Sequence, residues 1–377
     1  MATTARRTLG IATACFALVV TLSPRLAFAQ DGSFTAGKVF TATNSPVGNE
    51  LIVLGRAADG SLALMERLAT QGVGTGAGLG SQGAVTLSGD GRMVLVVNAA
   101  SHTLSLFSLT GLRPALVSVI DSGGLTPISV SESNGLIYVL NVGGAGNVAG
   151  FRLAPAGLQP IAGSTRALSA AGGTGPAQVG FSSDGGTLLV TEKATNKLIS
   201  WRVDMKSGLL GSRTVTPSAG VTPFGFAFDN RDRVFVSEAV GGAALASTTS
   251  SYVFAEQQPA KAMLVSASVP TLQTAACWVA VTPNGKFAYT GNAGSSSISQ
   301  YQVGRDGSLA LAEAAAGVTG IGTGVTDLAV SRSGQALYAL APGAMRVVAF
   351  EVGADGRLAP SSTLTGLPGM MVGLAAN

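Results

Sequence analysis

Hydrophobic and polar residues alternate along short segments of this chain, with the same kinds of turn between them. The clearest unit covers residues 84–98, where an alternating apolar segment, an Asp-Gly turn and a second apolar segment end in asparagine. Residues 279–292 repeat this unit around an Asn-Gly turn. Alternation with a period of two predicts half-buried β-strands, and Asp-Gly or Asn-Gly between two such segments predicts a hairpin.

The unit recurs along the whole chain at a regular spacing. Its second strand ends at Asn44, Asn98, Asn141, Glu192, Glu238, Asn292 and Ala341, with an average interval of about 50 residues. An aromatic residue within a third strand follows about nine residues later, at Phe107, Phe151, Trp201, Tyr301 and Phe350. A further Asp-Gly turn then leads to a fourth strand, as in residues 59–64 and 306–311. Four strands per repeat predict an all-β fold, a seven-bladed β-propeller with four-stranded blades.

The two ends of the repeat array are each incomplete. Residues 38–44 match the second strand of a blade and have no first strand before them, whereas residues 370–376 resemble a first strand with nothing after it. We therefore expect the C-terminal strand to pair with the N-terminal blade and close the ring. Such closure removes two exposed sheet edges at once.

The N-terminus has the features of a signal peptide. Arg6 and Arg7 precede an apolar run from Leu9 to Leu22, and small residues at Ala27 and Ala29 suit signal peptidase. We predict a signal peptide over residues 1–29 and a single propeller domain over residues 30–377, exported to the periplasm or secreted. A retained anchor is the alternative, although the run is shorter than the ~20 residues that span a bilayer. No later segment predicts a membrane span.

Composition and charge exclude several classes of protein. With 46% apolar and 11% charged residues, the chain is too hydrophobic to be disordered. Three of its 23 basic residues lie in the predicted signal peptide, so 20 basic residues face 19 acidic ones in the remainder. This balance gives no electrostatic basis for binding nucleic acid. Removal of the leader leaves Cys277 as the only cysteine, which excludes an intramolecular disulfide and suits a small buried side chain. We expect a monomer.

The strand endings carry a resemblance to a known family. Residues 138–141 (Tyr-Val-Leu-Asn), 289–292 (Tyr-Thr-Gly-Asn), 189–192 (Leu-Val-Thr-Glu) and 235–238 (Phe-Val-Ser-Glu) resemble the YVTN and lactonase-type seven-bladed propellers. The likeness extends over essentially the whole predicted mature chain. It implies the propeller fold, whereas the family includes 6-phosphogluconolactonase-like enzymes, proteins named carboxymuconate cyclases and members that only bind.

The histidine that the resemblance would imply is missing from its place. Lactonase-type members tend to carry an Arg-His pair just after Gly-Pro at the start of an innermost strand, but here Gly175-Pro176 leads into Ala177-Gln178. In other blades that position falls on Ala84, Ile128, Gly225, Trp278 and Asp327. Since acyl chemistry needs a proton donor or acceptor, lactonase activity does not carry over directly.

Neither a metal site nor a cofactor site is expected. The only histidine, His102, lies in a turn, and one histidine cannot build the usual multi-ligand zinc site. Residues 78–83 match the Gly-x-Gly-x-x-Gly pattern of dinucleotide-binding proteins. They lead into a strand and not into a helix, so the helix N-terminus that would hold a pyrophosphate is absent.

Polar residues at the strand ends are the remaining candidates for a site. In a propeller, the turns between second and third strands gather with the blade-to-blade connections around the mouth of the central channel. We therefore expect a polar rim there, with two further residues deeper on first strands. The rim comprises Asn98, Asn141, Glu192, Lys193, Glu238 and Asn292, and the deeper residues are Gln178 and Asp327. The alternative is that Asn and Glu at strand ends bond local backbone groups.

The rim supports two hypotheses about function. The first is a scaffold that binds an unknown small molecule or protein at the funnel mouth, on the face opposite the Asp-Gly and Asn-Gly turns. The second is a lactone hydrolase or cyclase in which Glu192 and Glu238, on adjacent blades, serve as acid and base. Whether the protein is an enzyme stays open at this point.

Overall fold

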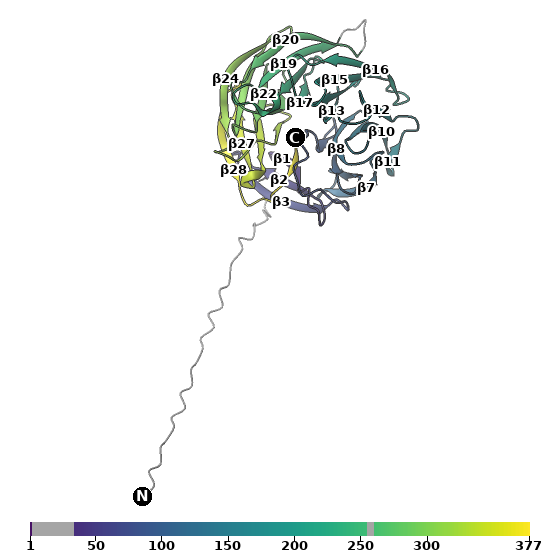
Figure 1. Ribbon diagram of the computed structural model, residues 1–377. Helices are drawn as coiled ribbons and strands as arrows, with labels where there is room; N and C mark the ends of the chain where they lie inside the picture. Colours follow the sequence, from purple (N-terminus) through teal and green to yellow (C-terminus); the bar gives the residue numbers. More distant parts are fainter. Residues whose placement is uncertain (2–33, 255–259) are drawn as a thin grey trace.

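The computed structural model describes Met1 and residues 34–254 and 260–377, so almost all of the predicted signal peptide lies outside the described residues. Seven antiparallel sheets form a ring around a central channel (Figure 1), which confirms the predicted seven-bladed β-propeller. Within the described part of the chain, no helix is long and apolar enough to cross a membrane.

The blades follow one another along the chain, and within each blade the strands are ordered from the channel outward. The first blade contains β29 (Val372–Ala376), β1 (Gly37–Ala42), β2 (Glu50–Arg56) and β3 (Leu62–Ala69). The second contains β4 (Val85–Leu87), β5 (Met93–Asn98), β6 (Thr103–Ser108) and β7 (Ala115–Asp121). The third contains β8 (Pro127–Ser133), β9 (Leu136–Asn141), β10 (Asn147–Ala154) and β11 (Gly157–Pro160), with β12 (Arg166–Ala167) also paired to β10.

The other four blades have the same order of strands. The fourth contains β13 (Pro176–Phe181), β14 (Thr187–Glu192), β15 (Lys197–Val203) and β16 (Leu210–Pro217). The fifth contains β17 (Pro223–Phe228), β18 (Val234–Glu238), β19 (Thr248–Phe254) and β20 (Ala262–Pro270). The sixth contains β21 (Ala276–Val281), β22 (Phe287–Asn292), β23 (Ser297–Val303) and β24 (Leu309–Val318). The seventh contains β25 (Asp327–Val330), β26 (Ala336–Ala341), β27 (Arg346–Val352) and β28 (Leu358–Leu364). Two short 3₁₀ helices, η1 (Val240–Gly242) and η2 (Pro342–Ala344), follow β18 and β26.

The order of strands gives the ring two distinct faces. We call the side that holds the blade-to-blade connections and the loops between second and third strands the connector face. The opposite side, with the turns between first and second and between third and fourth strands, is the turn face. The repeat positions from Asn98 to Ala341 are the last residues of second strands, as predicted, and therefore lie at the connector face.

The C-terminal strand closes the ring. β29 pairs antiparallel with β1, with Val39 opposite Ala376 and Ala42 opposite Val372, as predicted. The Lys38 N–H donates to Asn377 Oδ1 at 2.7 Å. The strand begins later than the sequence suggested, because Met370 lies before it and is 54% exposed.

Apolar side chains from neighbouring sheets fill the space between blades. The third-strand aromatic residues Phe107, Phe151, Trp201, Tyr301 and Phe350 are all buried. One cluster joins Phe40 of the first blade, Phe107 of the second and Phe151 of the third. The aromatic repeat is therefore core packing, which stabilises each blade against the next.

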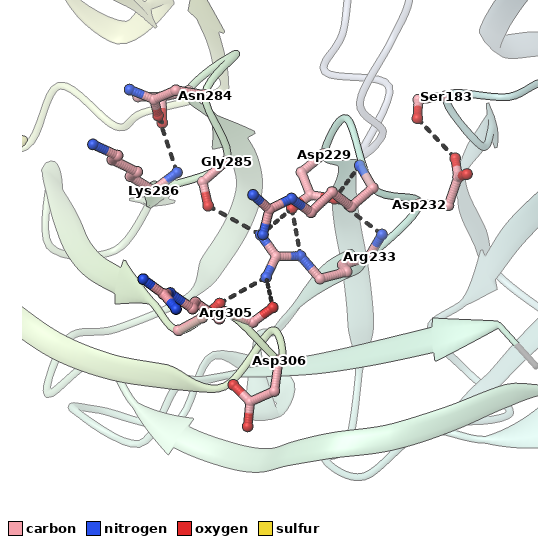
Figure 2. Close-up of polar contacts among 12 residues, drawn as sticks. Ser183, Asp229, Asp232, Arg233, Asn284, Gly285, Lys286, Arg305 and Asp306 are labelled. Carbon is pink, nitrogen blue, oxygen red and sulfur yellow. Dashed lines mark hydrogen bonds and ion pairs between the residues drawn. The ribbon is translucent and has the colours of Figure 1, made fainter.

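Polar side chains also join the blades at the turn face. Arg233 and Asp229 form a buried ion pair, with Nε donating to Oδ2 at 2.6 Å (Figure 2). From the fifth blade, the same guanidinium donates to the carbonyls of Gly285 at 3.1 Å and Gly304 at 2.6 Å in the sixth. Asp232 accepts from the Ser183 hydroxyl of the fourth blade at 2.7 Å. These contacts fix the order of the turns around the ring.

Deletion of residues 371–377 should prevent the ring from closing. It exposes the edge of β1, removes the buried side chains of Met371 and Leu374 from between the first and last blades, and removes Val372 from the cluster shared with the second blade. Burial of each such side chain is worth roughly 1.5 to 3 kcal/mol, and together they approach the whole stability of many domains. We expect no cooperative unfolding transition by calorimetry, with Met370→Ser as a full-length control that melts normally. A truncated protein that melts like the parent would show that β29 is dispensable.

Candidate functional site

The connection between the first and second blades covers the connector end of the channel. We call residues 79–83 the plug. The Ser81 hydroxyl donates to the Ile128 carbonyl of the third blade at 2.8 Å, and the Gln82 N–H donates to the Ala177 carbonyl of the fourth at 3.1 Å. The Trp278 indole of the sixth blade donates to the Ser81 carbonyl at 3.0 Å. A loop that enters between two neighbouring blades therefore reaches across the mouth to the far side of the ring.

The Gln82 side chain anchors the plug to the sixth blade. Its Oε1 accepts from the Val279 N–H at 3.0 Å, and its Nε2 donates to the Val279 carbonyl at 2.8 Å. A Cβ at Gly225 would lie 2.1 Å from Gln82 Oε1, so this position admits only glycine beside the amide. Lys193 adds a bond from Nζ to the Gly80 carbonyl at 2.5 Å and lies 4.6 Å from the centre of the Phe224 ring.

The plug packs against several of the positions where the lactonase resemblance would place its histidine. Ile128, Gly225 and Trp278 are three of those positions, and each contacts the plug through a hydrogen bond or close packing, whereas Gln178 and Asp327 hold two others in the wall of the channel. The chain thus lacks the histidine that the resemblance implies, and the plug fills part of the space where it would lie. The expected open funnel mouth is absent.

The asparagines predicted to form a rim are fully buried, so the expectation that they face an open mouth is wrong. Asn98, Asn141 and Asn292 are each 0% exposed. Asn98 Oδ1 accepts from Thr70 at 2.7 Å, and a Cβ at Gly72 would lie 2.2 Å from Asn98 Cγ. Asn141 and Asn292 bond serine or asparagine side chains close by in sequence. These amides tie the end of a second strand to neighbouring loops and strands.

The two predicted catalytic carboxylates are buried in the same way. Glu192 is 0% exposed and accepts from the Ser169 N–H and hydroxyl at 2.8 and 2.5 Å, and from Thr195 at 2.5 Å. Glu238, also 0% exposed, has a larger set of donors. They are the Gly220 N–H at 2.7 Å and the hydroxyls of Ser218, Thr248, Ser250 and Ser268. Both oxygens of each carboxylate are therefore occupied by donors of the protein itself.

A cavity of about 350 Å³ lies in the channel between the plug and the turn face. All seven innermost strands contribute to its wall. The plug end carries the polar side chains Gln82, Gln178 and Asp327, of which the last two were predicted from the sequence. The other end is apolar and is formed by the last residues of the strands, including Leu87, Phe181, Phe228, Val281 and Val330. The hollow of the channel therefore lies toward the face opposite the one that the sequence favoured.

Gln178 bridges two innermost strands. Its Oε1 accepts from the Phe226 N–H at 2.6 Å and its Nε2 donates to the Phe226 carbonyl at 2.9 Å. This is the same pair of bonds that Gln82 makes with Val279. Since the inner edge of a first strand has no neighbouring strand, each amide satisfies peptide groups that would otherwise lack a partner.

Asp327 is the ionisable side chain of the cavity wall. It is 1% exposed, and its oxygens accept from the backbone N–H groups of Leu328 at 2.8 Å and Leu374 at 3.0 Å. Burial raises the pKa of Asp327 to about 8, against the smaller opposing effect of these hydrogen bonds. At pH 7 the carboxyl therefore holds its proton.

The remaining reactive residues show no catalytic arrangement. His102 accepts the Thr126 N–H at 3.0 Å through Nδ1, as a turn residue would. Cys277 is buried, and that burial raises the pKa of its thiol to about 12, which keeps it from acting as a nucleophile near neutral pH. Across residues 34–254 and 260–377, no three His, Cys, Asp or Glu side chains gather as metal ligands.

Glu238→Gln should lower stability, because the Gly220 N–H and four hydroxyls all point at the side chain and an amide presents them with a donor. We expect a loss of about 1–3 kcal/mol in urea unfolding. Glu313→Gln, on the exposed outer strand β24, is the matched control and should be neutral. Unchanged stability together with lost ligand binding would restore Glu238 to a functional role.

The buried acid Asp327 should make stability fall as pH rises. Its folded pKa is raised, so between pH 4 and about 8 the folded state keeps a proton that the unfolded state has released. The contribution is complete below the unfolded pKa near 3.8 and is lost as pH rises through the folded value. Urea unfolding from pH 5 to 8 should show this slope, and Asp327→Asn should flatten it. Equal slopes for both proteins would contradict a raised pKa.

Comparisons with known proteins give matches among solved structures alone. No family model matches the chain, and no curated protein matches its sequence. A proposed 6-phosphogluconolactonase from Bacteroides uniformis superposes with a TM-score of 0.71 at 15% identity, over 90% of this chain and 99% of that one. The periplasmic gluconolactonase of Pseudomonas aeruginosa gives 0.67 at 16% identity, over 90% and 98%.

The same fold also occurs in a protein whose description does not mention a lactonase. A hypothetical selenium-binding protein from Sulfolobus tokodaii superposes with a TM-score of 0.62 at 11% identity, over 90% of this chain and 92% of that one. At such identities the comparisons establish architecture and not chemistry. The chain thus has the lactonase-like seven-bladed propeller fold that its strand-end motifs predicted.

Proposed function

We propose that this protein is a binding protein that takes a small molecule into the central cavity from the turn face. The observation that carries the proposal is the plug, which fills the connector mouth and leaves a cavity of about 350 Å³ beneath it. A volume of this size lies within the range of small-molecule sites. The partly apolar wall and the amides at its blind end favour a compact, uncharged ligand.

The chemistry of the cavity supports binding over turnover. Hydrolysis of a lactone needs a group that moves a proton and a water positioned to attack. In the cavity wall, Asp327 has both oxygens held by backbone N–H groups, and Gln82 and Gln178 are bonded to strand edges. None of these groups is free to follow a reacting atom without breaking contacts between blades.

Lactone hydrolysis is the second candidate, and two observations favour it. Solved structures of the same fold are described as lactonases. Asp327 also has a pKa of about 8, which suits a general acid near neutral pH. In this reading Asp327 would serve as the acid in place of the buried pair Glu192 and Glu238.

We also propose that the mature protein works in the periplasm or outside the cell as a monomer. The support comes from the sequence of the first 29 residues and from the fold, because the strands of the described residues all lie between Gly37 and Ala376. Residues 30–377 therefore contain all seven sheets that the structure describes.

A lactone assay and a binding assay separate the two candidates. We expect D-glucono-1,5-lactone to hydrolyse at its uncatalysed rate in the presence of residues 30–377. We also expect that one or more members of a panel of small neutral lactones and sugars will raise the melting temperature. Ala227→Trp, which fills the cavity wall, should abolish that shift, whereas Val215→Trp on the outer strand β16 should keep it.

Each contrary result has a definite meaning. Turnover that disappears in Asp327→Asn would establish the hydrolase reading, and turnover that disappears in Glu192→Gln would return catalysis to the connector face. A thermal shift that survives Ala227→Trp would place the ligand outside the cavity.

A further inference from the structure

The connector face carries most of the large apolar side chains that the described residues leave exposed. They lie in different loops around the ring, at Val47, Leu125, Val221, Leu245, Leu272, Ile321, Met345 and Met370. Val47 is 96% exposed and Ile321 is 104% exposed, so these side chains project into solvent without support from neighbours. On the turn face the corresponding set in the described chain is Leu112 alone. Of the two faces, the connector face therefore carries the exposed apolar loops, and the other exposed apolar residues of the blades lie on outer strands, at Val117, Val215, Met263, Leu264 and Val318.

Charge is distributed in the opposite way. In the loops of the connector face, all within the described residues, Lys193 is the only charged side chain apart from the titratable His102. The loops of the turn face carry many charges, among them Asp90, Arg92, Asp184, Asp204, Lys206, Arg231, Asp232, Lys286, Arg305, Asp306, Arg332, Asp355 and Arg357. A chain with only 11% charged residues thus keeps nearly all its loop charges on one side of the ring.

The strand ends add a small positive balance to the connector face. Glu50 and Arg67 pair with each other, and Asp121 is an exposed acid. Lys197 and Arg346 are partly exposed at this face, as is Lys193. Two acids lie beneath the surface, Glu192 and Glu238, and both are fully buried among their donors. The accessible charge is therefore slightly cationic.

We propose that the connector face docks on the surface of a lipid bilayer that contains anionic lipids. Uncharged loops with apolar tips can enter the interface between headgroups and acyl chains without taking ionised groups out of water. The half-exposed cations then lie at the level of the headgroups, where each Lys or Arg is attracted to anionic lipid. The inference is independent of the ligand in the central cavity.

The arrangement of the tips favours a bilayer over a protein partner. Protein interfaces concentrate aromatic and arginine anchors at a packed centre and surround them with a polar rim. Here the centre is the plug, and the exposed apolar residues stand apart on separate loops around it. A protein would need a matching pocket for each tip, whereas lipid adapts to any spacing. A hollow of about 650 Å³ beside Val47 and Met370 gives an acyl chain room at the first blade.

Vesicle binding of residues 30–377 tests the proposal, with a matched pair of variants. We expect sedimentation with vesicles of phosphatidylethanolamine and phosphatidylglycerol. Ile321→Ser should lower the partition coefficient about tenfold, the effect of withdrawing one large aliphatic side chain from an apolar phase. Leu112→Ser removes a side chain of equal exposure (104%) from the turn face and should change binding less than twofold. Both variants should melt like the parent, since neither side chain packs in the core.

Three results would overturn the proposal. The first is failure of the parent protein to bind these vesicles at low salt. The second is an equal effect of the two serine variants. The third is self-association of the parent, measured by light scattering without lipid and abolished by Ile321→Ser, which would assign the face to a second copy of the chain.

Discussion

The free inner edges of the first strands are the constraint on which this molecule depends. In a ring of blades each innermost strand pairs with its own sheet on one side only, so peptide groups toward the channel lack a partner. Gln82 and Gln178 each supply an amide that bonds both the N–H and the carbonyl of one residue on such an edge. Asp327 accepts the Leu374 N–H of the closing strand β29. The polar residues of the channel are therefore first of all parts of the ring.

This use of polar groups explains why the mouth is closed and the cavity has a single blind end. Val279 receives its amide not from the adjacent blade but from the plug, 197 residues away in sequence. That bond requires the loop to cross the channel, and the crossing fills the connector end of the channel. The space that remains in the channel faces the turns.

The sequence revealed the repeating architecture and the positions of its special residues, but not the role of those residues. The alternation of apolar residues and the turn residues are features of short sequence segments. They were therefore enough to locate the strand ends at Asn98, Glu192 and Glu238. A polar residue at a strand end looks the same in sequence whether it meets a ligand or a serine. The informative signal was glycine in the preceding connection, at Gly72 and Gly220, where a Cβ would collide with the buried side chain. The sequence around the plug gives no such signal, because the residues that the plug contacts are far away in the chain.

The two faces of the ring are held together by different kinds of interaction. At the turn face Arg233, paired with Asp229, joins the fifth blade to backbone carbonyls of the sixth (Figure 2), and most of the other loop charges are exposed to solvent. At the connector face most of the joining is done by neutral amides and hydroxyls around buried carboxylates, as at Glu238, and Lys193 and Arg346 each add a bond to a loop carbonyl. A face with few exposed charges has a small electrostatic cost on contact with an apolar environment. The unequal distribution of charged and apolar residues between the two faces thus follows from the kinds of bonds that join the blades on each side. It also sets the orientation in which the ring can approach a membrane, with the connector face toward the lipid and the cavity open to water at the turn face.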